Sequence, residues 1–258
     1  MAKENRTIKR TLDVMQLLKD MQMPLTITQI SSYLNVPRSS AFDIVNTLLQ
    51  EGFIESGDEA RKTYALGLRA FEIGAAYLRN NDLSPTTRPY LEKLMLLSHA
   101  TAFLAIENNG QLVYLDKVEA PTAIRTSAQL GSRNDMYCSG LGKALLATYP
   151  EKKIRMIFDK TEMKKLTDNT ITDYYALLDD LDKVRSRGYA IDNKEATHEI
   201  FCIAAPIYDS TNKGIAAISL AILYSNLNDE LIKEYAENIT DSALQISKKL
   251  GYTKQKLY

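Results

Sequence analysis

The segment from Thr26 to Ile54, TITQISSYLNVPRSSAFDIVNTLLQEGFI, constrains the fold more than any other part of this chain. It predicts a short helix capped at its first residue, a tight turn at 35–37, a second helix and the start of a strand. Apolar residues in the second helix recur with the spacing i, i+3, i+4, i+7, i+8, which is typical of one buried stripe. The stripe is formed by Ala41, Ile44, Val45, Leu48 and Leu49.

The polar side of this second helix indicates contact with nucleic acid. Ser39, Asp43 and Asn46 face away from the apolar stripe, and Ser40 and Phe42 lie on its flanks. Short polar side chains meet phosphate oxygens and base edges, and an aromatic ring can contact a thymine methyl group. Two helices joined by a tight turn, the second carrying such a face, predict a helix-turn-helix that binds a double-stranded DNA operator.

A hairpin after the second helix extends this motif to a winged helix over residues 5–67. Gly52 ends the helix, and strands at 53–55 and 63–66 flank a turn at 57–59. A first helix over residues 5–21 completes the domain. Its apolar spacing predicts a buried side formed by Ile8, Leu12, Met15 and Leu18.

The charge of the chain neither supports nor opposes this prediction. Formal net charge is zero, and basic and acidic residues also balance over residues 1–67. A basic footprint for DNA must therefore come from local clusters. Arg38 lies at the turn, and Arg61 and Lys62 lie at the hairpin tip. These side chains either form a solvated surface or contact the DNA backbone and minor groove. The same alternatives hold for Arg6, Lys9 and Arg10.

The rest of the chain follows a different pattern. A helix over 68–81 is expected to link two domains, with the boundary at 80–85 and Ser84 or Thr87 capping the next helix. Strands at 102–107 and 112–118 flank the turn Asn108-Asn109-Gly110, and others are expected at 189–191, 200–208 and 215–224. Helices are expected at 139–148, 150–158, 173–187 and 227–250. This mixture predicts the α+β class, with a central antiparallel sheet in a domain over residues 82–258.

Several classes of protein are not expected. Two widely separated cysteines do not make a disulfide framework, and the chain has neither a secretory signal nor an apolar run long enough to span a membrane. We therefore expect a soluble, cytoplasmic protein without a membrane partner. Asp192, His198 and Cys202 suggest a thiol nucleophile or a metal site, but residues within one strand-and-loop stretch seldom form a triad. No catalytic residue and no cofactor is expected, and metal binding by Cys138, His198 and Cys202 stays open.

Motifs spread over nearly the full length of the chain carry a resemblance to a known family. In the N-terminal part they are LTITQISSYLNVPRSSAFDIVNTLLQEGFI and YALG at 64–67. In the C-terminal part they are GSRNDMYCSGLGKALLA at 131–147, RGYAIDNKE at 187–195, and CIAAPIYD with GIAAISL at 202–220. In this order and spacing they resemble the IclR family of bacterial transcription regulators. The resemblance implies a winged helix-turn-helix, a linker helix and an effector-binding domain, assembled as a homodimer or homotetramer.

The resemblance also implies a site for a small-molecule effector. Asp192, Cys202 and Ser219 match family positions that line the effector pocket. Gly140 and Leu141 begin a predicted helix, where free backbone N–H groups can hold an anion such as a carboxylate metabolite. The alternatives are a tight turn that needs glycine at 140 and a small buried hydrophobe at 202.

Together these features predict a ligand-responsive DNA-binding regulator, expected to repress a catabolic operon until a small organic acid releases or tunes it. Asp43 stands where many family members carry Arg, and an acceptor there can read a cytosine amino group. The alternative is a small-molecule sensor or enzyme whose winged domain mediates protein contacts. The neutral charge of residues 1–67 keeps this alternative open.

Overall fold

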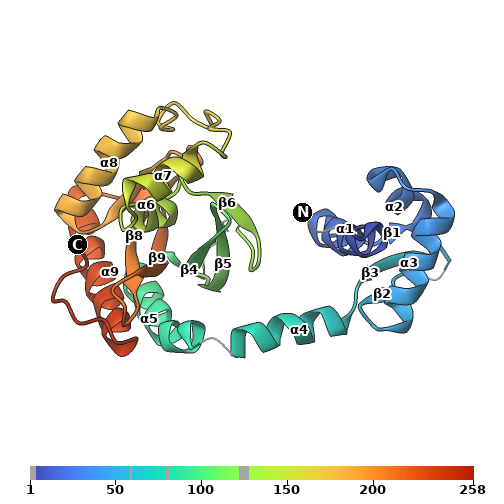
Figure 1. Ribbon diagram of the computed structural model, residues 1–258. Helices are drawn as coiled ribbons and strands as arrows, with labels where there is room; N and C mark the ends of the chain where they lie inside the picture. The colour runs from blue at the N-terminus through green and yellow to red at the C-terminus, as the bar shows by residue number, and fades with distance from the viewer. Residues whose placement is uncertain (1–3, 59, 80–81, 122–127) are drawn as a thin grey trace. The chain divides into compact units, whose positions relative to one another are not determined.

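A computed structural model describes residues 4–58, 60–79, 82–121 and 128–258 of the chain. The chain divides into two compact units, residues 1–80 and 81–258, which are described separately below. Figure 1 shows the helices and strands of each unit. None of the helices among the described residues combines the length and the apolar character needed to cross a membrane.

The first unit is a three-helix domain with a small sheet. Its helices are α1 (Arg6–Met21), α2 (Ile27–Leu34) and α3 (Arg38–Gln50). Strands β1 (Leu25–Thr26), β2 (Ile54–Ser56) and β3 (Thr63–Leu66) form an antiparallel sheet in the order β1-β3-β2. Thr26 begins α2 through a capping box with Gln29, and Asn35 ends it in the left-handed region with φ of 49°. Local sequence therefore sets both ends of the helix that precedes α3.

The core of this unit confirms the apolar stripe of α3 but not that of α1. Ala41, Ile44, Val45 and Leu48 are buried against Val14 and Leu18 of α1, with Leu49 packed at the edge. Ile8 and Leu12 were expected to be buried and are instead 59% and 60% exposed. Burial on α1 begins only at Val14, so the first two turns of α1 lie beyond the small core of this unit.

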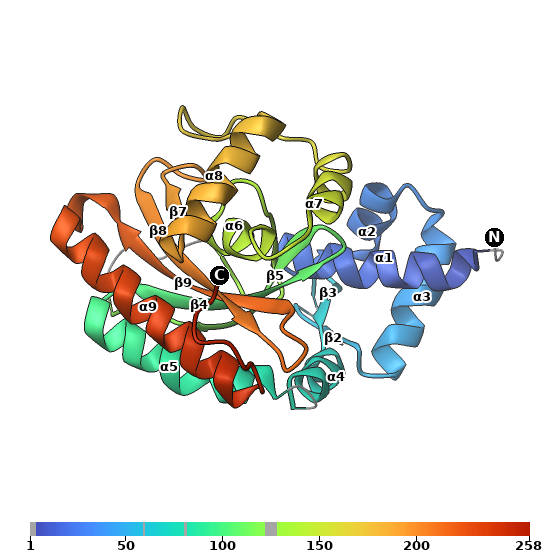
Figure 2. The same ribbon diagram turned by 60° about the vertical axis from the view of Figure 1, so that its left-hand side comes forward.

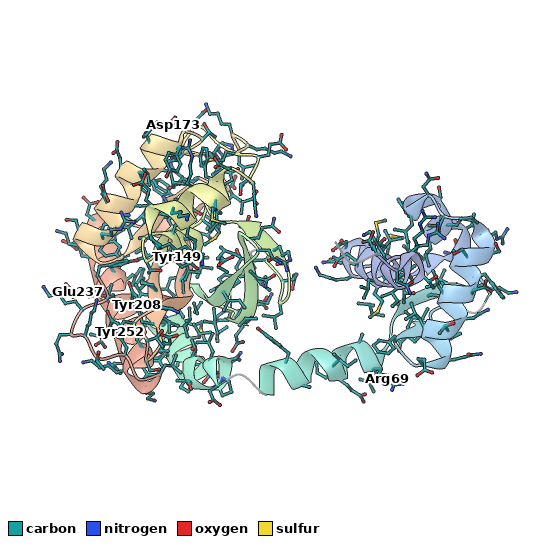
Figure 3. All side chains as sticks on the ribbon, viewed as in Figure 1. Arg69, Tyr149, Asp173, Tyr208, Glu237 and Tyr252 are labelled. Carbon is teal, nitrogen blue, oxygen red and sulfur yellow. The ribbon has the colours of Figure 1, made fainter. Side chains whose placement is uncertain are left out.

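Helix α4 (Leu68–Arg79) leaves the winged domain from a tightly packed corner. A side chain at Gly67 would place its Cβ 2.5 Å from the carbonyl oxygen of Gly52, so only glycine allows this approach. The guanidinium of Arg69 donates to the carbonyl oxygen of Glu51 at 2.9 Å and to its carboxylate at 3.0 Å. Arg69 also lies over the ring of Phe53 and is labelled in Figure 3. These contacts fix the start of α4 on the end of α3.

The second unit is built on an antiparallel sheet with the order β6-β5-β4-β9-β8-β7. The strands are β4 (Thr101–Asn108), β5 (Gln111–Val118), β6 (Arg133–Asp135), β7 (Ala190–Asn193), β8 (Ile200–Tyr208) and β9 (Gly214–Leu223). Asn109 and Gly110 turn β4 into β5 with positive φ angles of 56° and 85°, as the Asn-Gly hairpin signal predicts. The predicted α+β class with a central antiparallel sheet is confirmed. Strand β6 was not predicted.

Helices cover both faces of this sheet. Helices α5 (Leu83–Ser98) and α9 (Asp229–Lys249) lie along one face, and α6 (Gly140–Leu146) packs on the other with α7 (Glu151–Phe158) and α8 (Tyr174–Arg187), as Figures 1 and 2 show. A short 3-10 turn, Tyr224–Asn226, leads from β9 toward α9. The predicted caps Ser84 and Thr87 are wrong, because both residues lie inside α5, which begins at Leu83. Asn80 and Asn81 of the predicted boundary lie outside the described residues.

The last residues of the chain return to the sheet and to α6. Tyr252 stacks on Tyr208 of β8 with ring centroids 4.7 Å apart, and both residues are labelled in Figure 3. The hydroxyl of Tyr258 donates to the carbonyl oxygen of Ala144 at 2.9 Å. Leu257 is also buried. Residues 252–258 therefore contact the core of the unit.

Candidate functional site

The exposed face of α3 and the adjoining hairpin form a surface groove. Of the residues predicted to bind DNA, Arg38, Ser39, Phe42 and Asp43 of α3 line this groove, together with Lys62 of the hairpin. Phe42 is 50% exposed, which is unusual for a large apolar ring that could have turned into the core. The wall opposite α3 is completed by Ser56, Asp58, Thr63 and Tyr64. Because the apolar stripe of α3 faces the core, the polar face of α3 is left exposed to solvent.

The other three predicted residues lie outside the groove. Ser40 is half-buried and accepts a long hydrogen bond of 3.4 Å from the guanidinium of Arg10, which reaches it from α1. Asn46 is half-buried near the middle of α3. Arg61 forms an exposed ion pair with Asp58 at 3.6 Å, a type of contact that contributes little to stability. The arginine head is therefore free to exchange this partner for a phosphate.

The hairpin tip is shaped by Asp58. Its carboxylate accepts the backbone N–H groups of Ala60 and Arg61 at 2.9 and 3.2 Å, and its own N–H donates to Thr63. Lys62 takes the left-handed conformation with φ of 50°. Glu59, the next residue of the turn, lies outside the described residues. Asp58 thus acts on the backbone of the tip, which fixes where Lys62 and Arg61 project.

The second unit contains a cavity of about 440 Å³ beside the start of α6. Gly140, Leu141, Asp192, Cys202 and Ser219, which are the five residues predicted to bind an effector, all line it. Several lining residues were not predicted, and most of them come from β4, β5, β6 and the loop after β7. They are Phe103, Tyr114, Ala128, Asn134, Ser139, Ala196, Thr197, Glu199, Ile200, Ala221 and Leu223.

Strand register explains why residues far apart in sequence meet here. Asp192 on β7 lies directly opposite Cys202 on β8. Ser219 on β9 lies between Phe103 on β4 and Ala204 on β8. Residues at neighbouring register positions of adjacent strands share one face of a sheet. The cavity floor is therefore formed by the same face of the strands on which α6 packs.

Two glycines bring the start of α6 onto this floor. A Cβ at Gly140 would lie 3.3 Å from the Cβ of Cys202, and a Cβ at Gly142 would lie 2.1 Å from the carbonyl oxygen of Met136. The hydroxyl of Ser139 accepts the N–H of Gly142 at 3.2 Å and so caps the helix. Close backbone approach therefore accounts for the glycine at 142, and the capping hydrogen bond accounts for Ser139. The N–H groups of Gly140 and Leu141, at the start of α6, lie beside the cavity.

Asp192 is the buried carboxyl group of the cavity. It is 3% exposed, and its Oδ1 accepts the backbone N–H of Glu195 at 2.6 Å. Burial raises the pKa of Asp192 from its ordinary value to about 7, and the nearby charge of Glu195 adds to the rise. Burial also raises the pKa of the Cys202 thiol well above its usual range. Cys202 is therefore a neutral thiol and not an activated nucleophile.

Behind Asp192 lies a buried ion cluster. The ammonium of Lys143 on α6 is 2.6 Å from Oε1 of Glu195 and 2.8 Å from Oδ2 of Asp180 on α8. Lys143 is 1% exposed. Burial raises the pKa of Glu195, although the Lys143 ammonium opposes that rise. The cluster ties α6, α8 and the loop after β7 together and thereby holds Glu195 where its N–H meets Asp192.

The described residues do not assemble a metal site. Within them, no group of three or more His, Cys, Asp or Glu side chains is arranged to hold a metal ion. Cys202 lines the cavity, whereas Cys138 is buried under α6 and His198 is exposed. His198 is not among the residues that line the cavity with Asp192 and Cys202.

Comparison with known proteins gives consistent matches for both units. Residues 7–58 match the family model described as the IclR helix-turn-helix domain, and residues 75–248 match Bacterial transcriptional regulator IclR C-terminal. The HTH-type transcriptional repressor AllR of Escherichia coli is 32% identical over 246 residues, which cover 95% of this chain and 90% of AllR. The Thermotoga maritima IclR structure is 30% identical with a TM-score of 0.81, covering 95% of this chain and 99% of that one.

A further solved structure carries a bound ligand. It is an IclR homolog from Microbacterium hydrocarbonoxydans complexed with 4-hydroxybenzoate, and it covers 95% of this chain and 98% of its own. Its TM-score is 0.83 at 22% sequence identity, so the likeness concerns the fold.

Proposed function

Because this chain belongs to the IclR family of bacterial transcriptional regulators, we propose that it represses a catabolic operon and that a small organic acid tunes this repression. The family resemblance of the sequence is confirmed by these matches. The observation that best supports the proposal is the cavity beside α6, because its wall contains every residue predicted for effector binding. That the effector is an acid and that its effect is on repression are our own inferences.

We assign operator binding to residues 5–67. The groove between α3 and the hairpin is lined by Arg38, Ser39, Phe42, Asp43 and Lys62, which supply cations, short polar groups and one aromatic ring. In a helix-turn-helix dimer, two such helices enter successive major grooves of a near-palindromic site. Contacts to phosphates set the register, and Asp43 with Phe42 reads bases. Arg61 joins the phosphate contacts, with Ser40 and Asn46 at the inner edge of the helix face.

We assign effector binding and assembly to residues 82–258, with 68–81 as the linker. The N–H groups of Gly140 and Leu141 and the hydroxyl of Ser219 offer donors to a carboxylate, and the apolar wall of Phe103 accommodates its carbon skeleton. The effector acts only by binding one arrangement of a homodimer or homotetramer better than another. Operator DNA must then change effector affinity by the same factor. The site of action is the cytoplasm, where operator DNA lies.

A second function of a different class remains a competing proposal. A sensor or enzyme whose winged domain contacts protein stays open because residues 1–67 carry no net charge. The groove lined by Arg38 and Lys62 favours DNA instead, and no catalytic role is proposed for any residue. A steep loss of DNA affinity with rising salt would support operator binding. Contacts to phosphates release counterions from DNA, and high salt opposes that release.

The test uses the full chain and a duplex selected from a random pool by the unmodified protein. Replacing Arg38 and Ser39 with alanine should weaken binding to that duplex while ligand affinity measured by calorimetry stays unchanged. Ser219→Ala should do the reverse, with loss of the ligand response and retained DNA binding. Unchanged DNA affinity of the first variant in an anisotropy titration would remove the assignment of α3 as the recognition helix.

A further inference from the structure

The cavity that we assign to an acid carries carboxyl groups of its own. Asp192 and Glu199 line it, and none of the lining residues that the structure describes is Lys, Arg or His. The ammonium of Lys143 lies close behind Asp192 but contacts Glu195 and Asp180, and it is 1% exposed. The described wall therefore presents two acids and no free cation to an incoming carboxylate.

Resting on the proposed function, in which the cavity takes a small organic acid, we propose that the acid binds together with one proton, shared between its carboxylate and Asp192. In the bound state one neutral carboxyl group donates its O–H to one carboxylate. The proton comes from solvent and returns to it when the ligand leaves. Asp192 then acts as a hydrogen-bond donor, which an ionised aspartate cannot be.

The geometry of Asp192 favours this arrangement. Its Oδ1 accepts the backbone N–H of Glu195 at 2.6 Å, and the backbone N–H of Ala196 and the Cys202 thiol also interact with this carboxyl group, which together orient it at the cavity wall. Two carboxylates that share a site cannot both remain ionised, because desolvation and mutual repulsion both favour adding one proton to the pair. O–H donation to a carboxylate oxygen is among the stronger hydrogen bonds available to proteins. A ligand acid and Asp192 thus attract each other only when a proton lies between them.

The groups around Asp192 support a neutral form. Among the described residues, four of the groups around Asp192 are neutral or acidic, and the cation beside them, Lys143, is already paired. The neutral or acidic groups near Asp192 are Cys202 on β8, Tyr114 on β5, Cys138 in the segment before α6, and Glu195 in the loop after β7. The ammonium of Lys143 on α6 is bound by two carboxylates. Burial raises the pKa of Asp192 to about 7, so the proton is available near neutral pH.

Glu199 adds a consequence for ligand class. Its exposed side chain lies on the cavity wall on the β8 side, where no Lys or Arg among the described lining residues offsets it. A second carboxylate on the ligand would meet this charge without a shared proton. The cavity should therefore prefer monocarboxylates to dicarboxylates of similar length.

The test is titration calorimetry on the full chain with pyruvate, gluconate and 4-hydroxybenzoate as probes. Titrations at about pH 8.5 in two buffers of different ionisation enthalpy give the number of protons taken up on binding. We expect uptake of close to one proton, and affinity that falls about tenfold per pH unit above pH 7 and levels off below it. This measurement uses the unmodified protein, so it does not depend on the folding of a variant.

Two variants sharpen the result. Asp192→Asn keeps the shape and a donor but cannot take up the proton, so any binding that it retains should no longer vary with pH. Glu199→Gln should keep the proton uptake and narrow the preference for pyruvate over malonate. Binding of an acid without proton uptake, or an unchanged pH slope in Asp192→Asn, overturns the shared proton and leaves the proposed function standing. Failure of all three probes to bind at about pH 6 removes the acid effector itself.

Discussion

Replacing Lys143 with methionine tests how the buried ion cluster holds the effector domain together. Methionine keeps the length and apolar stem of the side chain but removes the ammonium that contacts Glu195 at 2.6 Å and Asp180 at 2.8 Å. Breaking a buried ion pair by removing one partner costs about 3–5 kcal/mol, since the remaining charge is left uncompensated. The side chain of Asp180 is 17% exposed and can regain water, whereas that of Glu195 is 6% exposed and cannot. We therefore expect the lower end, about 3 kcal/mol.

Thermal unfolding followed by circular dichroism measures this cost. For a domain of this size, a loss of about 3 kcal/mol lowers Tm by roughly 6–12 °C. The double variant Lys143→Met with Glu195→Leu removes the ammonium and the more deeply buried carboxylate and leaves only Asp180, so it should recover part of the loss. The double variant is thus the matched control for lost packing.

The cost should also depend on pH. Burial already raises the pKa of Glu195 in the folded state above its unfolded value, and loss of the Lys143 ammonium removes a group that opposes the rise. A carboxyl group with a raised folded pKa contributes stability at low pH, and that contribution is lost as pH rises through the folded pKa. The fall in Tm should therefore be smaller at about pH 5 than at about pH 8. A fall that is equal at both values, or a double variant less stable than the single one, would refute the reasoning.

Two further substitutions test the local structure. Gly142→Ala places a Cβ 2.1 Å from the carbonyl oxygen of Met136 and should cost about 3 kcal/mol or more in thermal unfolding, whereas Gly74→Ala in α4, with no atom within 4 Å, should be neutral or stabilising by about 0.5–1 kcal/mol. An equal effect of both would show that backbone approach does not set the start of α6. Thr26→Ala removes the capping box of α2 and should cost about 1 kcal/mol and weaken DNA binding, while Thr26→Ser should retain both. Equal stability of the Ala and Ser variants in urea unfolding would count against the cap.

Much of the fold was predictable because its signals are local. The α3 stripe follows from a period of 3.6 residues, and the Asn109-Gly110 turn follows from the φ angles that those residues tolerate. Strand β6 was missed because three residues carry no usable period. The burial expected for Ile8 failed because an apolar spacing does not tell how far a small core extends along a helix.

The site was predictable in part. Asp192, Cys202 and Ser219 were expected from motif positions, and the strand register then brings them to one wall. Phe103 and Tyr114 were missed, because an alternating pattern gives the inward face of a strand but not which inward residues border a cavity. The contact between Lys143 and Glu195 joins residues 52 positions apart, and no local sequence pattern in either segment predicts this contact.

The hydrogen bond from Tyr258 to Ala144 couples residues 252–258 to the helix that borders the cavity, so substitutions in this segment can affect the cavity. Ala144 lies one turn beyond Gly140, so residues 252–258 and the cavity floor hold the same short helix from different directions. Drift in this tail can shift the resting position of α6 without altering any residue that would touch a ligand. Selection therefore has a place to adjust the sensitivity of the sensor while its chemical preference is kept. Substitutions at residues 252–258 are therefore expected to change the response to a ligand while the cavity wall stays the same.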